Sequence, residues 1–453
     1  MRYLILFVGV MAVLVSEVSA TPLFSRQTGM ACSSCHFQHF PLLNGFGRAF
    51  KSAGYTMMGG QHKIESDGLS IPSTLNMAVV TTTGYEKSNQ AEGAFPERTT
   101  GNGLVYLPAG GGELSLFFGG RVSENTGFLG ELAVGDAVSG AHSSAKMPID
   151  ASSVFSFMPD GMRTSFVPFA TDALGASYGF ELLNTGANAV QQMISTPGFN
   201  GAHSGAFSAQ QYLGTNGPAK GVAIVLSHPM GYINLTKFNR TGITNGGRAS
   251  LDSTYIRVAG VFQVSGWDAA VGTQMWNGSS AVANPDSASP FVLLMADTKA
   301  TAVDGQMQGL IGDIPVGFYA SYARAPVVAA DTGAGFLGNA YNTYNTQISL
   351  TSPSRGIVAT GIDAKSSFNL SVEAGVIPDQ TTLGAAIRSG KNGDGNTDNA
   401  IMLIGTYKIA RNMVCSLAFT SSSGSYWNSN DTKTGTTDQV GNTTYTINLF
   451  AAF

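Results

Sequence analysis

The sequence predicts an all-β protein, a transmembrane antiparallel β-barrel of about 16 strands that follows a small N-terminal α-helical domain. Charged residues make up only 11% of the 453 residues, whereas typical soluble domains have about 25%. Glycine is frequent, at 57 residues, and aromatic residues reach 10%. Beyond the N-terminus no apolar run approaches the ~20 residues of a membrane helix, which leaves the barrel as the membrane architecture that fits.

Residues 1–20 read as a signal peptide for export. Arg2 supplies the positive charge, residues 3–15 are apolar, and Val18, Ser19 and Ala20 offer small side chains before a cleavage that leaves Thr21 first. An N-terminal membrane anchor is the alternative, but the apolar run is short for a span. We therefore expect a protein of the Gram-negative cell envelope, located in the outer membrane.

The segment CSSCH at residues 32–36 is the most informative motif. Two thiols two residues apart, followed at once by a histidine, have the spacing of covalent haem c attachment. Cys32 and Cys35 would form thioethers, and His36 would be the proximal iron ligand. A chance run, a small disulfide or a zinc pair would have the same spacing, but export favours haem, which is attached outside the cytoplasm. Cys415 reads as a small residue in a strand.

Residues 21–68 form the expected monohaem cytochrome c domain, with a short helix or turn at residues 45–51. Phe46 and Phe50 are four residues apart, so one face of this helix could pack on the haem edge. A unit of this size buries too little surface to fold alone and needs a neighbour.

The haem also needs a distal ligand or an open face. Met57, Met58 and His62 are the candidate ligands, and a ligand from the barrel or none at all remains open. His39 follows His36 too closely to reach the opposite haem face and reads as a polar residue of the first turn. Arg26 and Arg48 are candidate partners for the haem propionates, because arginine binds carboxylates in a bidentate way.

From about residue 70 the apolar residues alternate with period two, which is typical of strands with one polar and one apolar face. Leu114, Leu116 and Phe118 illustrate the pattern. At roughly two dozen residues per strand and loop, residues 69–453 give about 16 strands, and bacterial barrels favour even numbers. In the terminal strand Tyr445 and the alternate residues through Phe453 form one face, and Phe450 makes the other face less regular.

The motif region carries a family resemblance. Residues 24–29 (FSRQTG), 32–36 (CSSCH), 40–48 (FPLLNGFGR) and 50–55 (FKSAGY) together resemble the fused outer-membrane monohaem cytochrome–porin family, whose best-known members are iron-oxidising outer-membrane cytochromes c. The match covers about residues 22–55, and the remainder is similar only in length and barrel character. The resemblance implies a small haem domain that plugs a barrel of ~16 strands.

The resemblance also implies a function, the exchange of electrons between extracellular Fe(II) and a periplasmic carrier such as a soluble cytochrome c. We expect one covalent haem c, outer-membrane lipid as surroundings, and oxidation of Fe(II) as the activity. Outward electron transfer to an extracellular acceptor is one alternative, and a solute porin with a structural or sensory haem is another. A soluble cytochrome with a β-sandwich is a third. The mild net charge of -4 argues against nucleic acid as a partner.

Overall fold

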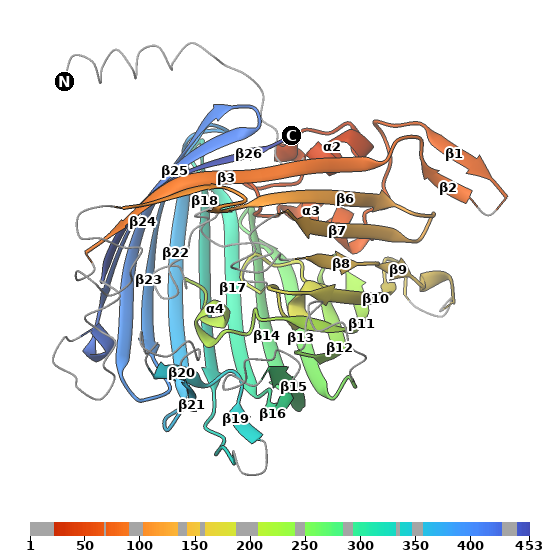
Figure 1. Ribbon diagram of the computed structural model, residues 1–453. Coiled ribbons are helices and arrows are strands. Elements are labelled where there is room, and N and C mark those ends of the chain that lie inside the picture. The colour runs from red at the N-terminus through yellow and green to blue at the C-terminus, as the bar shows by residue number, and fades with distance from the viewer. Residues whose placement is uncertain are drawn as a thin grey trace, which may run out of the picture.

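The computed structural model contains a closed antiparallel β-barrel of 16 strands, as the sequence predicts (Figure 1). It describes residues 22–67, 69–89, 103–134, 143–154, 159–186, 207–240, 250–283, 293–331, 336–346, 357–427 and 442–453. The predicted signal peptide lies outside the described residues.

The barrel strands follow one another in chain order, and the last pairs with the first to close the wall. Two short strands, β8 and β9, both pair with β10 and together make one of the 16. The barrel strands are β3 (Asn76–Ser88), β6 (Leu114–Arg121), β7 (Gly127–Ala133), β8 (Ser144–Lys146), β9 (Ile149–Asp150), β10 (Arg163–Thr171), β11 (Ala219–His228), β12 (Gly231–Asn239), β13 (Ser253–Val264), β14 (Trp267–Asn277), β17 (Ala300–Ile311), β18 (Ile314–Ala325), β22 (Lys365–Ile377), β23 (Thr381–Lys391), β24 (Thr397–Ala410), β25 (Met413–Ser423) and β26 (Thr443–Ala452).

The alternation in the sequence has its cause in the two environments of the wall. In β26, Tyr445 and Ile447 are exposed on the outside, whereas Thr446 and Asn448 are buried on the inside. Exposed apolar side chains repeat this pattern around the outer surface, for example Ile224, Val303 and Leu403. An apolar outer band around a polar interior is the arrangement of an outer-membrane barrel, so the chain is an outer-membrane protein.

The two ends of the barrel differ. At one end, tight turns join β11 to β12, β13 to β14 and β17 to β18, and the second of these turns contains Ser265 and Gly266, both with positive φ. At the other end, β18 stops at Ala325 and β22 begins only at Lys365. Because outer-membrane barrels place short turns in the periplasm and long loops outside, the tight-turn end is periplasmic. Both the start of β3 and the chain end at Phe453 lie there.

The remaining elements are short helices, turns and strands, and two of these strands extend the wall beside β3. None of the described helices is long and apolar enough to cross a membrane. The helices are α2 (Pro22–Thr28), α3 (Gly45–Ser52) and α4 (Ala209–Leu213), with 3-10 turns η1 (Cys32–Ser34), η2 (Ser152–Val154), η3 (Ala176–Tyr178) and η6 (Ser425–Trp427). The further strands are β1 (Lys63–Ser66), β2 (Leu69–Pro72), β4 (Leu104–Pro108), β5 (Gly111–Gly112), β15 (Ser279–Ala283), β16 (Leu293–Asp297), β19 (Phe336–Asn339), β20 (Thr343–Thr346) and β21 (Ile357–Thr360).

Two pieces of chain occupy the lumen. Residues 22–62, here called the N-terminal unit, carry α2, η1 and α3 and contact the inner face of the wall at the periplasmic end (Figure 1). The connection between β10 and β11, residues 172–218, is here called the lumen segment, and its described parts are 172–186 and 207–218. It contains α4, which packs against β18 and β22 inside the barrel.

Candidate haem-binding site and lumen contacts

The two motif thiols lie on a tight turn of the N-terminal unit. The amides of Cys35 and His36 both donate to the carbonyl of Cys32, at 3.0 and 2.9 Å. Ser25 of α2 contacts the Cys32 sulfur at 3.5 Å. Both cysteines are thiols in the structure, and burial, followed by the charge of Cys32, raises the pKa of Cys35. The compact turn is set by backbone hydrogen bonds and needs no disulfide.

The imidazole of His36 is held by one ring nitrogen. Nδ1 lies 3.1 Å from the carbonyl oxygen of Leu42, while Nε2 has no hydrogen-bond partner among the described residues. A carbonyl accepts only, so Nδ1 carries the hydrogen and Nε2 presents its lone pair. Burial lowers the pKa of His36 to about 4, so the ring is neutral near pH 7. A neutral imidazole with its second nitrogen hydrogen-bonded is the usual state of a metal-ligating histidine.

Helix α3 packs against the backbone of the motif. Its N-cap residue, Asn44, accepts a hydrogen bond from the Gly47 amide at 2.9 Å, and the Asn44 amide donates to the Cys35 carbonyl at 3.0 Å. A Cβ on Gly47 would lie 2.1 Å from that carbonyl oxygen, so only glycine allows this approach. The predicted helix at residues 45–51 is therefore confirmed and borders the thiols.

The expected packing of Phe46 and Phe50 on a haem edge stays a prediction. Phe50 is buried against Phe24 and Tyr55, with ring centroids 5.1 and 5.8 Å apart, whereas Phe46 is exposed. Phe50 therefore packs in the interior of the N-terminal unit, and Phe46 keeps an exposed apolar surface on the same helix.

An aromatic contact joins the motif to the end of the chain. The ring of Phe40 lies edge-on to His36, at a centroid distance of 5.3 Å, and stacks on Phe450 of β26 at 6.0 Å. Val80, Ala452 and Phe117 complete this apolar cluster. Phe450 thus breaks the polar pattern of the inner face because it packs on the N-terminal unit.

His39 is not an ordinary polar residue of a first turn. Its Nε2 lies 2.7 Å from Oε2 of Glu373 on β22, and both side chains are buried. Its Nδ1 contacts the carbonyl of Phe40 at 2.7 Å. Burial lowers the pKa of His39, but the charge and hydrogen bond of Glu373 outweigh burial, and the net direction of this pKa is upward. His39 therefore fixes the loop after the motif to the barrel wall.

Both predicted propionate partners have defined contacts. Arg48 is buried and pairs with Asp268 of β14 through Nη2 at 2.5 Å, while its buried Nη1 has no hydrogen-bond partner within the described part of the chain. Arg26 donates from Nη1 to the backbone carbonyl of Met77. The orphaned Nη1 of Arg48 leaves a donor for a carboxylate, which fits the predicted role.

The candidate distal ligands lie on a segment bound to α2. Gln27 donates to the carbonyls of Tyr55 and Met57 at 2.6 and 2.8 Å. The side chain of Met57 is exposed, Met58 is half-buried and His62 is exposed. No hydrogen bond or ring contact among the described residues joins these three to His36. The distal ligand therefore stays a prediction, with these three residues, a residue of the barrel or no ligand as the alternatives.

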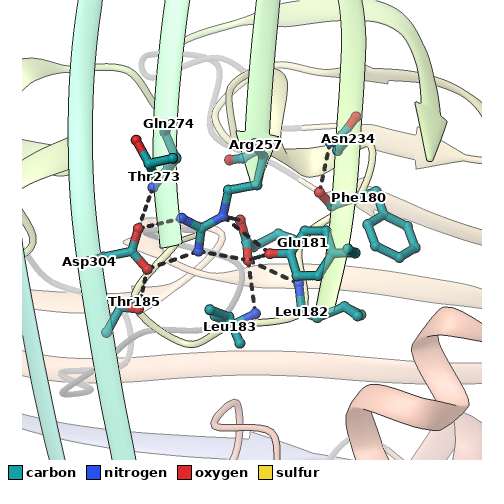
Figure 2. Close-up of polar contacts among 12 residues, drawn as sticks. Phe180, Glu181, Leu182, Leu183, Thr185, Asn234, Arg257, Thr273, Gln274 and Asp304 are labelled. Atoms are coloured by element: carbon teal, nitrogen blue, oxygen red, sulfur yellow. Dashed lines mark hydrogen bonds and ion pairs between the residues drawn. The ribbon is translucent and has the colours of Figure 1, made fainter. Parts of the chain in front are cut away.

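A buried charged cluster attaches the lumen segment to the wall (Figure 2). Arg257 of β13 pairs with Asp304 of β17 through Nη1 at 2.5 Å, and its Nε lies 3.1 Å from Glu181 of the lumen segment. All three side chains are fully buried. Tyr232 donates to Glu181, and Thr185 donates to Asp304 at 2.6 Å. Two acids surround one arginine, so each charge has a partner inside the lumen.

The second described part of the lumen segment binds the adjoining strands of the wall. The amide of Ala209, in α4, donates to Ser321 of β18 at 3.0 Å. The guanidinium of Arg388, on β23, lies 5.2 Å from the ring centroid of Tyr212. Gln210 donates to the carbonyl of Thr185 at 2.9 Å and so joins the two parts. The segment therefore contacts one continuous stretch of the wall, from β13 through β17 and β18 to β23.

Sequence reasoning missed Glu181, Arg257, Asp304 and Glu373, because each is isolated in the sequence. Their only signal is rarity: in a chain with 11% charged residues, a charge within an alternating strand is a candidate for a specific partner.

Comparison of the sequence with known proteins gives no match to a family model and none to a curated protein. Among solved structures, the chain is similar to outer-membrane-expressed OmpT of Vibrio cholerae, with 10% identity and a TM-score of 0.44 over 86% of this chain and 100% of that chain. It is also similar to the outer membrane channel DcaP of Acinetobacter baumannii, with 10% identity and a TM-score of 0.46 over 84% of this chain and 97% of that chain. Because both TM-scores are below 0.5, the fold assignment rests on the strand topology described above.

Proposed function

We propose that the chain is an outer-membrane cytochrome–porin that moves electrons across the outer membrane. In this proposal Cys32 and Cys35 bind one haem c covalently, and His36 is its proximal ligand. The donor is extracellular Fe(II), and the acceptor is a periplasmic carrier such as a soluble cytochrome c. The family resemblance of residues 22–55 supports this choice of donor and acceptor.

The geometry of His36 carries the proposal. Nδ1 is bound to the Leu42 carbonyl at 3.1 Å, and Nε2 is left without a partner beside two thiols of the CSSCH motif. A haem c needs two thiols, one neutral imidazole and an apolar surround. Phe40 and Phe450 supply apolar surface on one side of the ring. Arg48 offers a donor for a propionate.

The location within the barrel supports a role in electron transfer more than solute passage. The motif lies near the periplasmic mouth, so a soluble carrier would meet it without entering the lumen. The lumen segment lies inside the barrel and is bound to the wall at Arg257 of β13 and at Arg388 of β23. Solute diffusion needs an open lumen, whereas an electron needs only a short path through packed protein.

The bound haem would supply one-electron redox chemistry. Each Fe(II) ion outside the cell would lose one electron and become Fe(III), and the carrier in the periplasm would gain that electron. No proton is transferred, and no covalent bond forms or breaks, in this electron transfer. Leu42 of the N-terminal unit would hold the proximal ligand, and the barrel would separate donor from acceptor.

The proposal is tested on the purified full chain in detergent. We expect a haem c absorbance spectrum that survives denaturation, and reduction of this haem when Fe(II) is added. The variant Cys32→Ser/Cys35→Ser is the control, because it should form the same barrel without covalent haem. A wild-type chain without haem, or a haem that stays oxidised with Fe(II) in solution, contradicts the proposal. Ion or solute flux equal to that of an open porin would favour a solute channel instead.

A further inference from the structure

Asn184 of the lumen segment contacts Leu43, which lies in the loop that follows the CSSCH motif. Asn184 accepts a hydrogen bond from the Leu43 amide through Oδ1 at 2.8 Å and donates from Nδ2 to the Leu43 carbonyl at 3.1 Å. Asn184 is fully buried, and Leu43 is nearly so. One amide side chain thus satisfies both backbone groups of a residue 141 positions away, in the way that a neighbouring strand would.

Leu43 belongs to the short two-stranded loop that holds His36. His36 and Leu43 face each other as an antiparallel bridge. The Phe37 amide donates to the Leu42 carbonyl at 3.0 Å, and the Asn44 amide donates to the Cys35 carbonyl at 3.0 Å. The carbonyl of Leu42 also accepts the hydrogen bond from Nδ1 of His36. The position of residues 42 and 43 therefore decides the length and angle of that hydrogen bond.

Asn184 is itself fixed by the barrel wall. Its backbone amide donates to Oε1 of Gln306, on β17, at 2.7 Å. The next residue, Thr185, is bound to Asp304, which pairs with Arg257. A continuous series of buried contacts thus runs from the middle of the wall to the proximal histidine.

We propose that Asn184 is a positioning residue for His36, so that the lumen segment helps to set the redox potential of the haem. This inference rests on the proposed function. The Nδ1 hydrogen bond increases the electron density that an imidazole donates to its metal, which stabilises the oxidised iron. Loss of the Asn184 contacts lets residues 42 and 43 move, weakens that hydrogen bond, and raises the potential.

The test is a redox titration of the haem-loaded full chain, followed by absorbance. Asn184→Leu keeps a similar volume and removes both contacts with Leu43. Asn234→Leu is the matched control, because Asn234 of β12 is equally buried and donates to the carbonyl of Phe180 in the same lumen segment at 3.0 Å (Figure 2). We expect a higher midpoint potential for Asn184→Leu and the wild-type potential for Asn234→Leu.

A second variant covers the case in which Asn184→Leu does not accumulate with haem. Gln306→Leu leaves the Asn184 side chain in place but removes the acceptor of its backbone amide, and we expect a smaller rise of the potential. An unchanged potential in the measurable variant overturns the inference, as does an equal shift in Asn234→Leu. A wild-type chain without covalent haem instead contradicts the proposed function, and the inference with it.

Discussion

The ring of Phe450, in the last strand, stacks on the ring of Phe40, in the loop after the CSSCH motif, with centroids 6.0 Å apart and ring planes at 22°. The two residues are almost the whole chain apart, and their contact joins the closing strand of the barrel to the N-terminal unit. The wall therefore supplies the burial that the unit of residues 22–62 cannot supply for itself.

Removal of the Phe450 ring should lower the local stability of the loop that contains His36. We expect Phe450→Ala to lower local stability by about 3–5 kcal/mol, because it removes a large buried ring and leaves a cavity. Hydrogen exchange of the amides of residues 36–44, measured by mass spectrometry, reads this directly. Phe419→Ala is the control, since Phe419 packs on Tyr445 in the wall, at 5.1 Å, away from the loop. Unchanged exchange in Phe450→Ala would show that the ring does not hold the loop.

Substitution of either motif cysteine should change the absorbance of the haem, whereas substitution of Cys415 should not. We expect Cys32→Ser or Cys35→Ser to lose one thioether each, which leaves one vinyl group unreacted and shifts the absorbance of the reduced haem to longer wavelength. Cys415→Ser should leave the spectrum unchanged, because Cys415 lies in β25. The measurement is the absorbance of the pyridine complex of the denatured chain. A shift in the Cys415 variant, or none in the other two, would contradict the assignment.

The His39–Glu373 pair should make docking of the N-terminal unit pH-dependent. The pKa of His39 is raised from 6.5, so its contribution is fully present below pH 6.5 and is lost as the pH rises through the raised pKa. The protection factors of the amides of residues 36–44, which divide out the intrinsic base-catalysed exchange rate at each pH, should therefore fall on the alkaline side. Glu373→Gln should remove this dependence and cost about 3–5 kcal/mol, because it breaks a buried pair.

Glu65→Gln serves as the control for this pH series, because Glu65 is exposed on β1. The same alkaline fall of the protection factors in Glu373→Gln as in the wild type would rule out His39 as the titrating group.

The Arg257 cluster should keep the lumen segment bound to the wall of the barrel. Arg257→Met leaves Glu181 and Asp304 buried without a cation, which costs about 3–5 kcal/mol and favours release of the segment from the wall. We expect the single-channel conductance in a planar bilayer to rise. Arg163→Met is the control, because Arg163 forms its ion pair with Asp150 at a half-exposed site. A conductance equal to that of the wild type would mean that the cluster does not limit the opening.

The barrel was predictable because lipid on one side of the wall and the lumen on the other impose an alternation of apolar and polar residues. This alternation is seen in β26, and the strand number follows from length. Phe450 is an apolar residue on the otherwise polar inner face of β26 because it contacts Phe40.

The cysteines and histidine of the site were predictable because haem attachment requires them at fixed spacing. The residues that position them were not. His39 meets Glu373 across 334 positions, and Leu43 meets Asn184 across 141. Only closure of the barrel and entry of the lumen segment bring these pairs together, and neither event has a local pattern.

Electron transfer across a sealed membrane tests the central claim most directly. The full chain is reconstituted into vesicles that contain oxidised soluble cytochrome c, Fe(II) is added outside, and the absorbance of the enclosed cytochrome is followed. We predict reduction of the enclosed cytochrome with the wild-type chain and none with Cys32→Ser/Cys35→Ser. Equal reduction with both chains, or none with either, would contradict a haem-dependent electron path through this barrel.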